Sequence, residues 1–225
     1  MRPSNVIPIA IVAAGLILAI AVYLTLKVGT PLAPLTGNSA LVRPVDTTDH
    51  ILGNPAAEIK IVEYSDFDCP HCATFNATLH QIVSDYAASG KVAWVFRNFA
   101  LTELYPNSKK HAEAAECVAL GSGNSAYFTF NDALFANQPV DPIKYAELAR
   151  AAGASPNAVA TCIQNAAALV DPGIDADRQN ALALGAQGTP YSLIIVEGKA
   201  PIIIDGAWGY ADLKDEIERA LAELK

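Results

Sequence analysis

The stretch "YSDFDCPHCATF", Tyr64 to Phe75, contains the pair of cysteines on which the interpretation of the whole chain depends. Cys69 and Cys72 stand two residues apart, with Pro70 and His71 between them. A pair with this spacing can ligate a metal, attach a haem, form an inert structural disulfide or act as a redox couple. The residues around the pair distinguish these possibilities.

Two of the possibilities are disfavoured by the residues present. Covalent haem attachment requires Cys-x-x-Cys-His, but the residue after Cys72 is Ala73. A structural zinc ion needs four ligands, usually from two such pairs, and Cys117 and Cys162 stand alone in the sequence. We therefore expect neither a haem nor a metal site.

The cysteine pair lies between a predicted strand and a predicted helix. "EIKIVEYS" (58–65) alternates like a half-buried strand and places Glu63 on its apolar face. Pro70 suits the first turn of a helix that ends near Gly90. "KVAWVFRNF" (91–99) is the next predicted strand, which gives the order strand, helix, strand.

This position favours chemistry at the pair over an inert loop disulfide. A thiolate at a helix N-terminus faces free backbone N–H groups and the positive end of the helix dipole, which lowers its pKa. Cys69 is the candidate for that nucleophilic thiol, and we expect its sulfur to be exposed. Cys72, one turn deeper, is expected to be shielded and to resolve mixed disulfides. Pro70 and His71 are expected to tune the pair.

The N-terminal part of the chain predicts a membrane anchor. Val6 to Leu26 is about 21 residues without a charge, long enough as a helix to span a hydrocarbon core of ~30 Å. A cleavable signal peptide has a shorter apolar region, so we favour a retained single-pass helix. Arg2 and the α-amino group lie before it and Lys27 lies after it, which gives a small bias toward a cytoplasmic N-terminus. That orientation predicts a catalytic domain outside the cytoplasm, in the periplasm or an equivalent space.

Charge and cysteine content agree with this location. The formal net charge of the chain is −8, with 15 basic and 23 acidic residues, which makes nucleic acid an improbable partner. Four cysteines suit an exported domain, because disulfides persist outside the cytoplasm.

The remainder of the chain predicts helices followed by a hairpin. Residues 106–185 are rich in alanine and read as several helices, with a first break at "GSGNS" (121–125). "YSLIIV" (191–196) and "PIIID" (201–205) predict two strands, and a final amphipathic helix follows. We expect an α/β fold in which a mixed sheet has helices on both faces.

Three features in combination resemble a known family. "LGNPAAEIKIVEYSDFDCPHC", the helical block and "GTPYSLIIV" are together similar to the DsbA-like branch of the thioredoxin superfamily, over residues 45–225. The resemblance implies a thioredoxin-like domain interrupted by a helical subdomain, and no cofactor. The expected organisation is a transmembrane anchor (1–28), a linker (29–44), the first part of the thioredoxin-like domain (45–105), the inserted helical subdomain (106–185) and the second part of the domain (186–225).

The resemblance also implies roles for residues outside the motif. Pro190 matches the family's cis-proline opposite the active-site disulfide, and Thr189 would offer its backbone to an extended substrate segment. Glu63 matches the buried acid that exchanges protons with the inner cysteine. Four cysteines permit three pairings, and the family implies Cys69 with Cys72 and Cys117 with Cys162. Two buried free thiols are the alternative for the second pair.

The implied activity is thiol:disulfide exchange. We expect a membrane-tethered enzyme that donates the Cys69–Cys72 disulfide to thiols of exported proteins and is reoxidised by a membrane redox partner, which the resemblance suggests is linked to quinone. A disulfide reductase or isomerase is the alternative, since Thr189 before the proline is shared with isomerases of the family. A non-catalytic chaperone or metal carrier that uses the same thiols is a third candidate.

Three histidines outside the motif receive no role. His50, His80 and His111 have no chemical motif around them in the sequence. We expect them at the surface or at helix ends.

Overall fold

The computed structural model describes residues 35–36 and 41–224. The predicted transmembrane helix, Val6 to Leu26, and most of the predicted linker lie outside these residues. Within them, no helix is both long and apolar enough to cross a bilayer. The anchor therefore stays a prediction.

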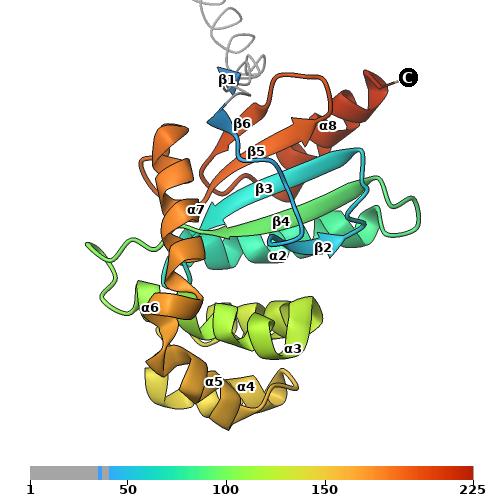
Figure 1. The fold of residues 1–225 in the computed structure, drawn as a ribbon. Helices are drawn as coiled ribbons and strands as arrows, with labels where there is room; N and C mark the ends of the chain where they lie inside the picture. The colour runs from blue at the N-terminus through green and yellow to red at the C-terminus, as the bar shows by residue number, and fades with distance from the viewer. Residues whose placement is uncertain (1–34, 37–40, 225) are drawn as a thin grey trace, which may run out of the picture. The chain divides into compact units, whose positions relative to one another are not determined.

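A six-stranded mixed sheet forms the centre of the domain (Figure 1). Only β3 and β4 run parallel, and the other neighbouring strands are antiparallel. This confirms the predicted mixed sheet, and it adds two short edge strands, β1 and β2, that the sequence analysis missed. Across the sheet the order is β1 (Leu35–Thr36), β6 (Ile202–Asp205), β5 (Tyr191–Val196), β3 (Ile59–Ser65), β4 (Val92–Asn98) and β2 (His50–Gly53).

Helices cover both faces of the sheet, as predicted. The face that carries Ile59, Ile61 and Glu63 packs against α2 (Pro70–Asp85) and α8 (Tyr210–Ala222). The opposite face, with Val62 and Tyr64, packs against α7 (Asp171–Ala183). Because side chains alternate along a strand, β3 serves both cores, and all its residues except Lys60 are buried.

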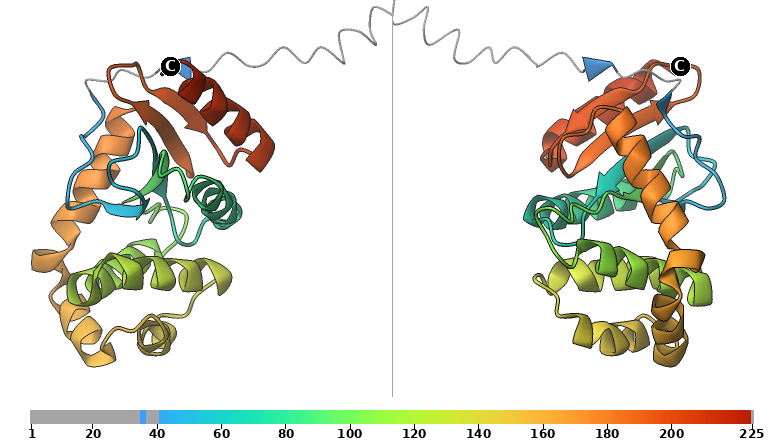
Figure 2. Two further views of the ribbon diagram at one scale, coloured as in Figure 1. Left: turned by 90° about the vertical axis from the view of Figure 1, so that its right-hand side faces the viewer. Right: turned by 60° about the vertical axis from the view of Figure 1, so that its left-hand side comes forward.

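Helices α3 to α7 form the predicted insertion between β4 and β5. In Figure 2, α3, α4 and α5 pack together beside the sheet, and α7 returns along it. The predicted break at 121–125 is present, because Gly123 has a non-helical φ of 80° and ψ of −177° and divides α3 into two helical segments. Before α7, the insertion consists of α3 (Ser108–Ala136), the 3-10 turn η2 (Pro142–Lys144), α4 (Tyr145–Ala151), α5 (Pro156–Gln164) and α6 (Ala166–Leu169).

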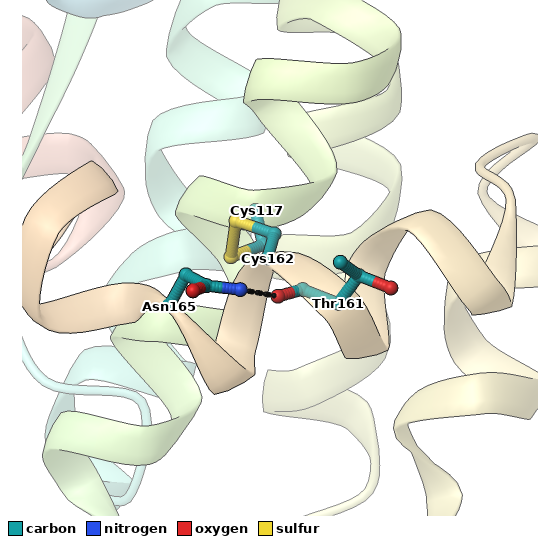
Figure 3. Close-up of a disulfide and its surroundings, with 4 residues drawn as sticks. All are labelled: Cys117, Thr161, Cys162 and Asn165. Carbon is teal, nitrogen blue, oxygen red and sulfur yellow. Dashed lines mark hydrogen bonds between the residues drawn. A yellow bond between two sulfur atoms is a disulfide. The ribbon is translucent and has the colours of Figure 1, made fainter.

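A disulfide joins two helices of the insertion. Cys117 of α3 is bonded to Cys162 of α5, with 45 residues of sequence separation between them. Figure 3 shows this bond beside the end of α5, where the Asn165 amide donates to the Thr161 carbonyl at 2.8 Å. The bond therefore closes a long loop inside the inserted helices.

A buried arginine fastens the start of the described chain to the sheet. Arg97 of β4 has no exposed surface and donates from Nε to Asp49 Oδ1 at 2.9 Å. It also donates from Nη2 to the Arg43 carbonyl at 3.0 Å, and Arg43 pairs with Asp177 of α7 at 2.8 Å. Residues 43–49 are thus held against β4, on the face opposite Glu63.

Candidate active site

The strand-to-helix junction after β3 carries the reactive pair. Cys69 caps the N-terminus of α2 in an extended conformation, and Pro70 occupies the first turn. Proline suits this position because a first-turn residue has no intrahelical N–H bond to lose. Cys69 and Cys72 are both free thiols. Pro70 and His71 are exposed at the same helix end.

Burial of the two thiols differs from the prediction for one of them. Cys72 is fully buried, as expected, but Cys69 is also only 4% exposed, so the expectation of an exposed sulfur was wrong. The Cys69 sulfur packs against the loop before β5, 3.3 Å from the Thr189 carbonyl oxygen. That contact, made by a residue distant in sequence, covers most of the sulfur.

The environment separates the proton affinities of the two thiols. The pKa of Cys69 is lowered to about 5, chiefly because the Cys72 thiol donates a hydrogen bond to it. The Thr189 side chain and the backbone N–H groups of Cys72 and His71 add to this effect. Burial raises the pKa of Cys72 well above its usual range. Cys69 is therefore a thiolate at neutral pH, and Cys72 keeps its proton.

The loop before β5 lies directly against the pair. The Thr189–Pro190 peptide is cis, and Pro190 is buried. The Pro190 carbonyl accepts from the Gly206 N–H at 3.0 Å, which ties the loop to the residue that follows β6. Thr189 is half-buried, and its carbonyl faces the Cys69 sulfur.

Glu63 is the acid on the same face of the sheet as the thiols. It has no exposed surface, and Ser65 Oγ donates to its Oε1 at 2.8 Å. Burial raises the pKa of Glu63 to about 8, and the Ser65 hydrogen bond opposes the shift. The charge of Glu63 in turn raises the pKa of Cys72, so the two groups interact electrostatically.

The insertion holds the turn that precedes Cys69 through residues that the sequence analysis missed. Asp66 accepts from Ser108 Oγ at 2.5 Å, and Gln138 Nε2 donates to the carbonyl oxygens of Phe67 and Cys69 at 2.6 and 3.1 Å. No local motif marks these contacts, because each joins segments more than 40 residues apart.

His111 corrects one prediction at this turn. It has no exposed surface, and its Nε2 lies 3.1 Å from Asp68 Oδ1 while its Nδ1 lies 2.6 Å from the Tyr145 hydroxyl. Burial lowers its pKa. The expectation of a surface position for His111 was therefore wrong, because Asp68 and Tyr145 supply partners that satisfy a buried ring.

The second cysteine pair does not belong to the active site. Cys117 and Cys162 are bonded to each other within the insertion and take no part in the thiol pair. Among residues 35–36 and 41–224, no cluster of three or more His, Cys, Asp or Glu side chains is arranged to hold a metal ion.

A low-pKa thiolate at a helix N-terminus, a buried partner thiol and an acid beside them, carried on this fold, define a thiol:disulfide oxidoreductase. The chain belongs to the thioredoxin family, because the family model described as Thioredoxin matches residues 46–219.

Solved structures share this fold. The oxidised form of BdbD from Bacillus subtilis is 24% identical, with a TM-score of 0.69, over 84% of this chain and 98% of that one. The α-DsbA1 of Wolbachia pipientis is also 24% identical, with a TM-score of 0.69, over 83% of this chain and 98% of that one. A thioredoxin-like oxidoreductase from Silicibacter pomeroyi DSS-3 is 25% identical, with a TM-score of 0.65, over 79% and 94% of the two chains.

Curated relatives match over part of their length. The Na⁺/H⁺ antiporter NhaA 3 of Salinispora tropica is 36% identical over 112 residues, which is 48% of this chain and 16% of that protein. The probable disulfide bond formation protein D of Bacillus cereus is 33% identical over 96 residues, 42% of this chain and 43% of that protein.

Proposed function

We propose that this protein oxidises the thiols of exported proteins by donating a Cys69–Cys72 disulfide. The observation that carries the proposal is the low pKa of Cys69, about 5, beside a Cys72 whose pKa is raised. A stabilised thiolate favours the reduced form of the pair, so its disulfide is a strong oxidant. The name of the Bacillus cereus relative, a probable disulfide bond formation protein, also supports this direction.

The exchange takes place in two steps. A substrate thiolate attacks Cys69 Sγ, the Cys69–Cys72 bond breaks, and Cys72 leaves with the electron pair and takes up a proton. A second substrate thiolate then attacks the substrate sulfur of the mixed disulfide and releases Cys69 as a thiolate. The substrate loses two electrons and gains a disulfide, and the enzyme gains those electrons as one thiol and one thiolate.

Glu63 supplies the proton that Cys72 needs when it leaves. With a pKa of about 8, Glu63 is mostly protonated at neutral pH although it is a carboxylic acid. After it gives the proton to Cys72 it must recover one, and the reverse transfer serves the reoxidation of the pair.

Substrate recognition falls mainly on the main chain at Thr189. An extended peptide segment beside Cys69 would pair with the Thr189 backbone as an added strand, which depends little on the peptide's sequence. A broad range of unfolded proteins would then be accepted.

We also propose a membrane tether and an extracytoplasmic location. The uncharged run from Val6 to Leu26 supports the tether, and the presence of a disulfide between Cys117 and Cys162 supports an oxidising compartment. Catalytic turnover then needs a membrane redox partner linked to quinone, which the tether would keep close. In intact cells treated with a reductant, a membrane-impermeant thiol reagent should label Cys69, and the full chain should resist extraction from membranes by alkaline carbonate.

The direction of transfer is tested with a single turnover. Oxidised full-length protein is mixed with reduced, unfolded ribonuclease A in the absence of oxygen and glutathione. We expect one substrate disulfide to form per enzyme molecule, and none with the Cys69→Ser variant. Failure of the wild-type protein to oxidise the substrate, together with efficient reduction of insulin by its dithiol form, would favour the reductase or isomerase instead.

A further inference from the structure

Ser65 makes a buried hydrogen bond to the acid beside the thiols. It is the last residue of β3, two positions after Glu63, so both side chains lie on the face that packs against α2. Ser65 is 1% exposed and Glu63 has no exposed surface, and Ser65 Oγ lies 2.8 Å from Glu63 Oε1. The hydroxyl is thus a fixed neighbour of one carboxyl oxygen.

The second oxygen of Glu63 is free of such a partner. Oε2 is buried and makes no hydrogen bond with any residue that the structure describes. When Ser65 donates to Oε1 and the proton sits on Oε2, one buried group stays unpaired. If the proton sat on Oε1 and pointed at Ser65, both the serine O–H and Oε2 would be unpaired. The first arrangement is favoured, because each unpaired buried polar group carries a desolvation penalty.

We propose that Ser65 is a positioning residue for proton exchange, which holds Oε1 of Glu63 and leaves Oε2 as the oxygen that gives a proton to Cys72 and takes it back. This inference rests on the proposed function. In the forward step the Cys69–Cys72 bond breaks, Cys72 receives its electron pair and then the Oε2 proton, and Glu63 becomes a carboxylate. The Ser65 hydroxyl stabilises that carboxylate until a solvent proton replaces the one lost.

Among the described residues around Glu63, Ser65 is the one that donates a hydrogen bond to its carboxyl group. The Cys69 thiolate at the N-cap of α2 raises the pKa of Glu63. The charge of Glu63 in turn raises the pKa of Cys72 on α2 and of Tyr127 on α3. The Trp94 indole on β4 lowers the pKa of Glu63 less than Ser65 does, and its Nε1 makes no hydrogen bond to any described residue. The buried cation of this sheet, Arg97, is bonded to Asp49 on the opposite face.

The chain provides a matched control in Ser192. It is the register partner of Glu63 on the neighbouring strand β5 and has no exposed surface. Its Oγ makes no hydrogen bond to any described residue. Ser65→Ala and Ser192→Ala therefore each remove one buried hydroxyl beside Glu63, but only the first removes a hydrogen bond to it.

The test is a carbon-13 NMR titration of the Glu63 carboxyl in the oxidised full-length protein, in which neither active-site thiol titrates. The signal is assigned with Glu63→Gln. We expect Ser65→Ala to raise the pKa of Glu63 by about one unit, a tenfold change in proton affinity. Ser192→Ala should leave the pKa unchanged, and Ser65→Thr, which keeps the hydroxyl, should restore the wild-type value.

Three results would overturn the inference. They are an unchanged Glu63 pKa in Ser65→Ala, an equal shift in Ser192→Ala, and the same rise in a folded Ser65→Thr variant. If Ser65→Thr does not fold, the comparison of the two alanine variants decides. The titration does not depend on activity, so a protein that fails to oxidise substrates still reports on Ser65.

Discussion

The sulfur of Cys69 lies 3.3 Å from the carbonyl oxygen of Thr189, although 120 residues separate the two in the chain. Antiparallel pairing of β5 with β3 produces this contact, because it brings the start of β5 beside the end of β3. The active site therefore belongs to both halves of the interrupted domain. Its properties depend on the loop at Thr189 as well as on the Cys-Pro-His-Cys motif.

We predict that Thr189→Val raises the pKa of Cys69. The Thr189 side chain contributes to the low value of about 5, and valine keeps the shape but not the hydroxyl. The hydroxyl lowers the pKa of Cys69 without a hydrogen bond of ordinary geometry, so its loss should raise that pKa by less than about one unit. Ultraviolet thiolate absorbance of the reduced protein during a pH titration measures the shift. An unchanged titration curve would show that the Thr189 backbone alone acts on the sulfur.

We predict that Glu63→Gln stabilises the reduced protein at neutral pH. The pKa of Glu63 is about 8 in the folded protein against 4.5 for an ordinary glutamate, so between these values the folded state binds a proton that the unfolded state has lost. Stability then falls by about 1.4 kcal/mol per pH unit through this window. The variant avoids that loss and should gain about 3 kcal/mol over the wild type by pH 7.

Chemical denaturation at a series of pH values measures this gain. The difference between variant and wild type should be small near pH 4 and should grow up to about pH 8, where the wild-type carboxyl ionises in both states. A gain that did not vary with pH would contradict the assignment.

We predict that Gln138→Met loosens the turn before Cys69. The substitution keeps the length of the side chain but removes the hydrogen bonds to the carbonyl oxygens of Phe67 and Cys69. The free energy of unfolding should fall by about 1–2 kcal/mol. Amide hydrogen exchange near Cys69 should also become faster.

A neighbouring residue provides the control for this variant. The Asn137 amide donates to the Ala133 carbonyl within its own helix, so Asn137→Ala should leave exchange near Cys69 unchanged. Equal effects of the two variants would show that the insertion does not hold the turn through Gln138.

We predict that replacing both Cys117 and Cys162 by alanine lowers stability but preserves the active site. The bond spans 45 residues of sequence, and the chain-entropy relation gives a loss of about 4 kcal/mol as an upper figure. Denaturation in guanidinium chloride measures the loss. The pKa of Cys69 should stay the same, and a large change in it would show that the insertion shapes the thiol pair through this bond.

Features with a local signal could be predicted from the sequence. The strand at 59–65, the helix from Pro70 and the placement of Glu63 on an apolar face follow from periodicities of two and 3.6 residues. The chemistry of the Cys69–Cys72 pair could be proposed because it depends on that strand-to-helix junction.

Features created by distant partners could not be predicted in this way. The edge strand His50–Gly53 has only four residues, too few for a periodic signal, and it exists because β4 pairs with it. Arg97 is buried in a strand that reads as apolar, since Asp49 neutralises it. His111 and Cys69 were expected to be more exposed, but Asp68 and Thr189, which cover them, come from other parts of the chain.

The equilibrium of the Cys69–Cys72 pair with glutathione tests the central claim most directly. Full-length protein is equilibrated in glutathione buffers of known ratio, and the fraction of dithiol is measured after acid quenching and alkylation. Stabilisation of the Cys69 thiolate favours the reduced form of the pair. We therefore expect the pair to have a reduction potential between about −120 and −180 mV, the range of strong protein oxidants. A potential near −270 mV, roughly that of thioredoxin, would contradict the oxidase and identify a reductase.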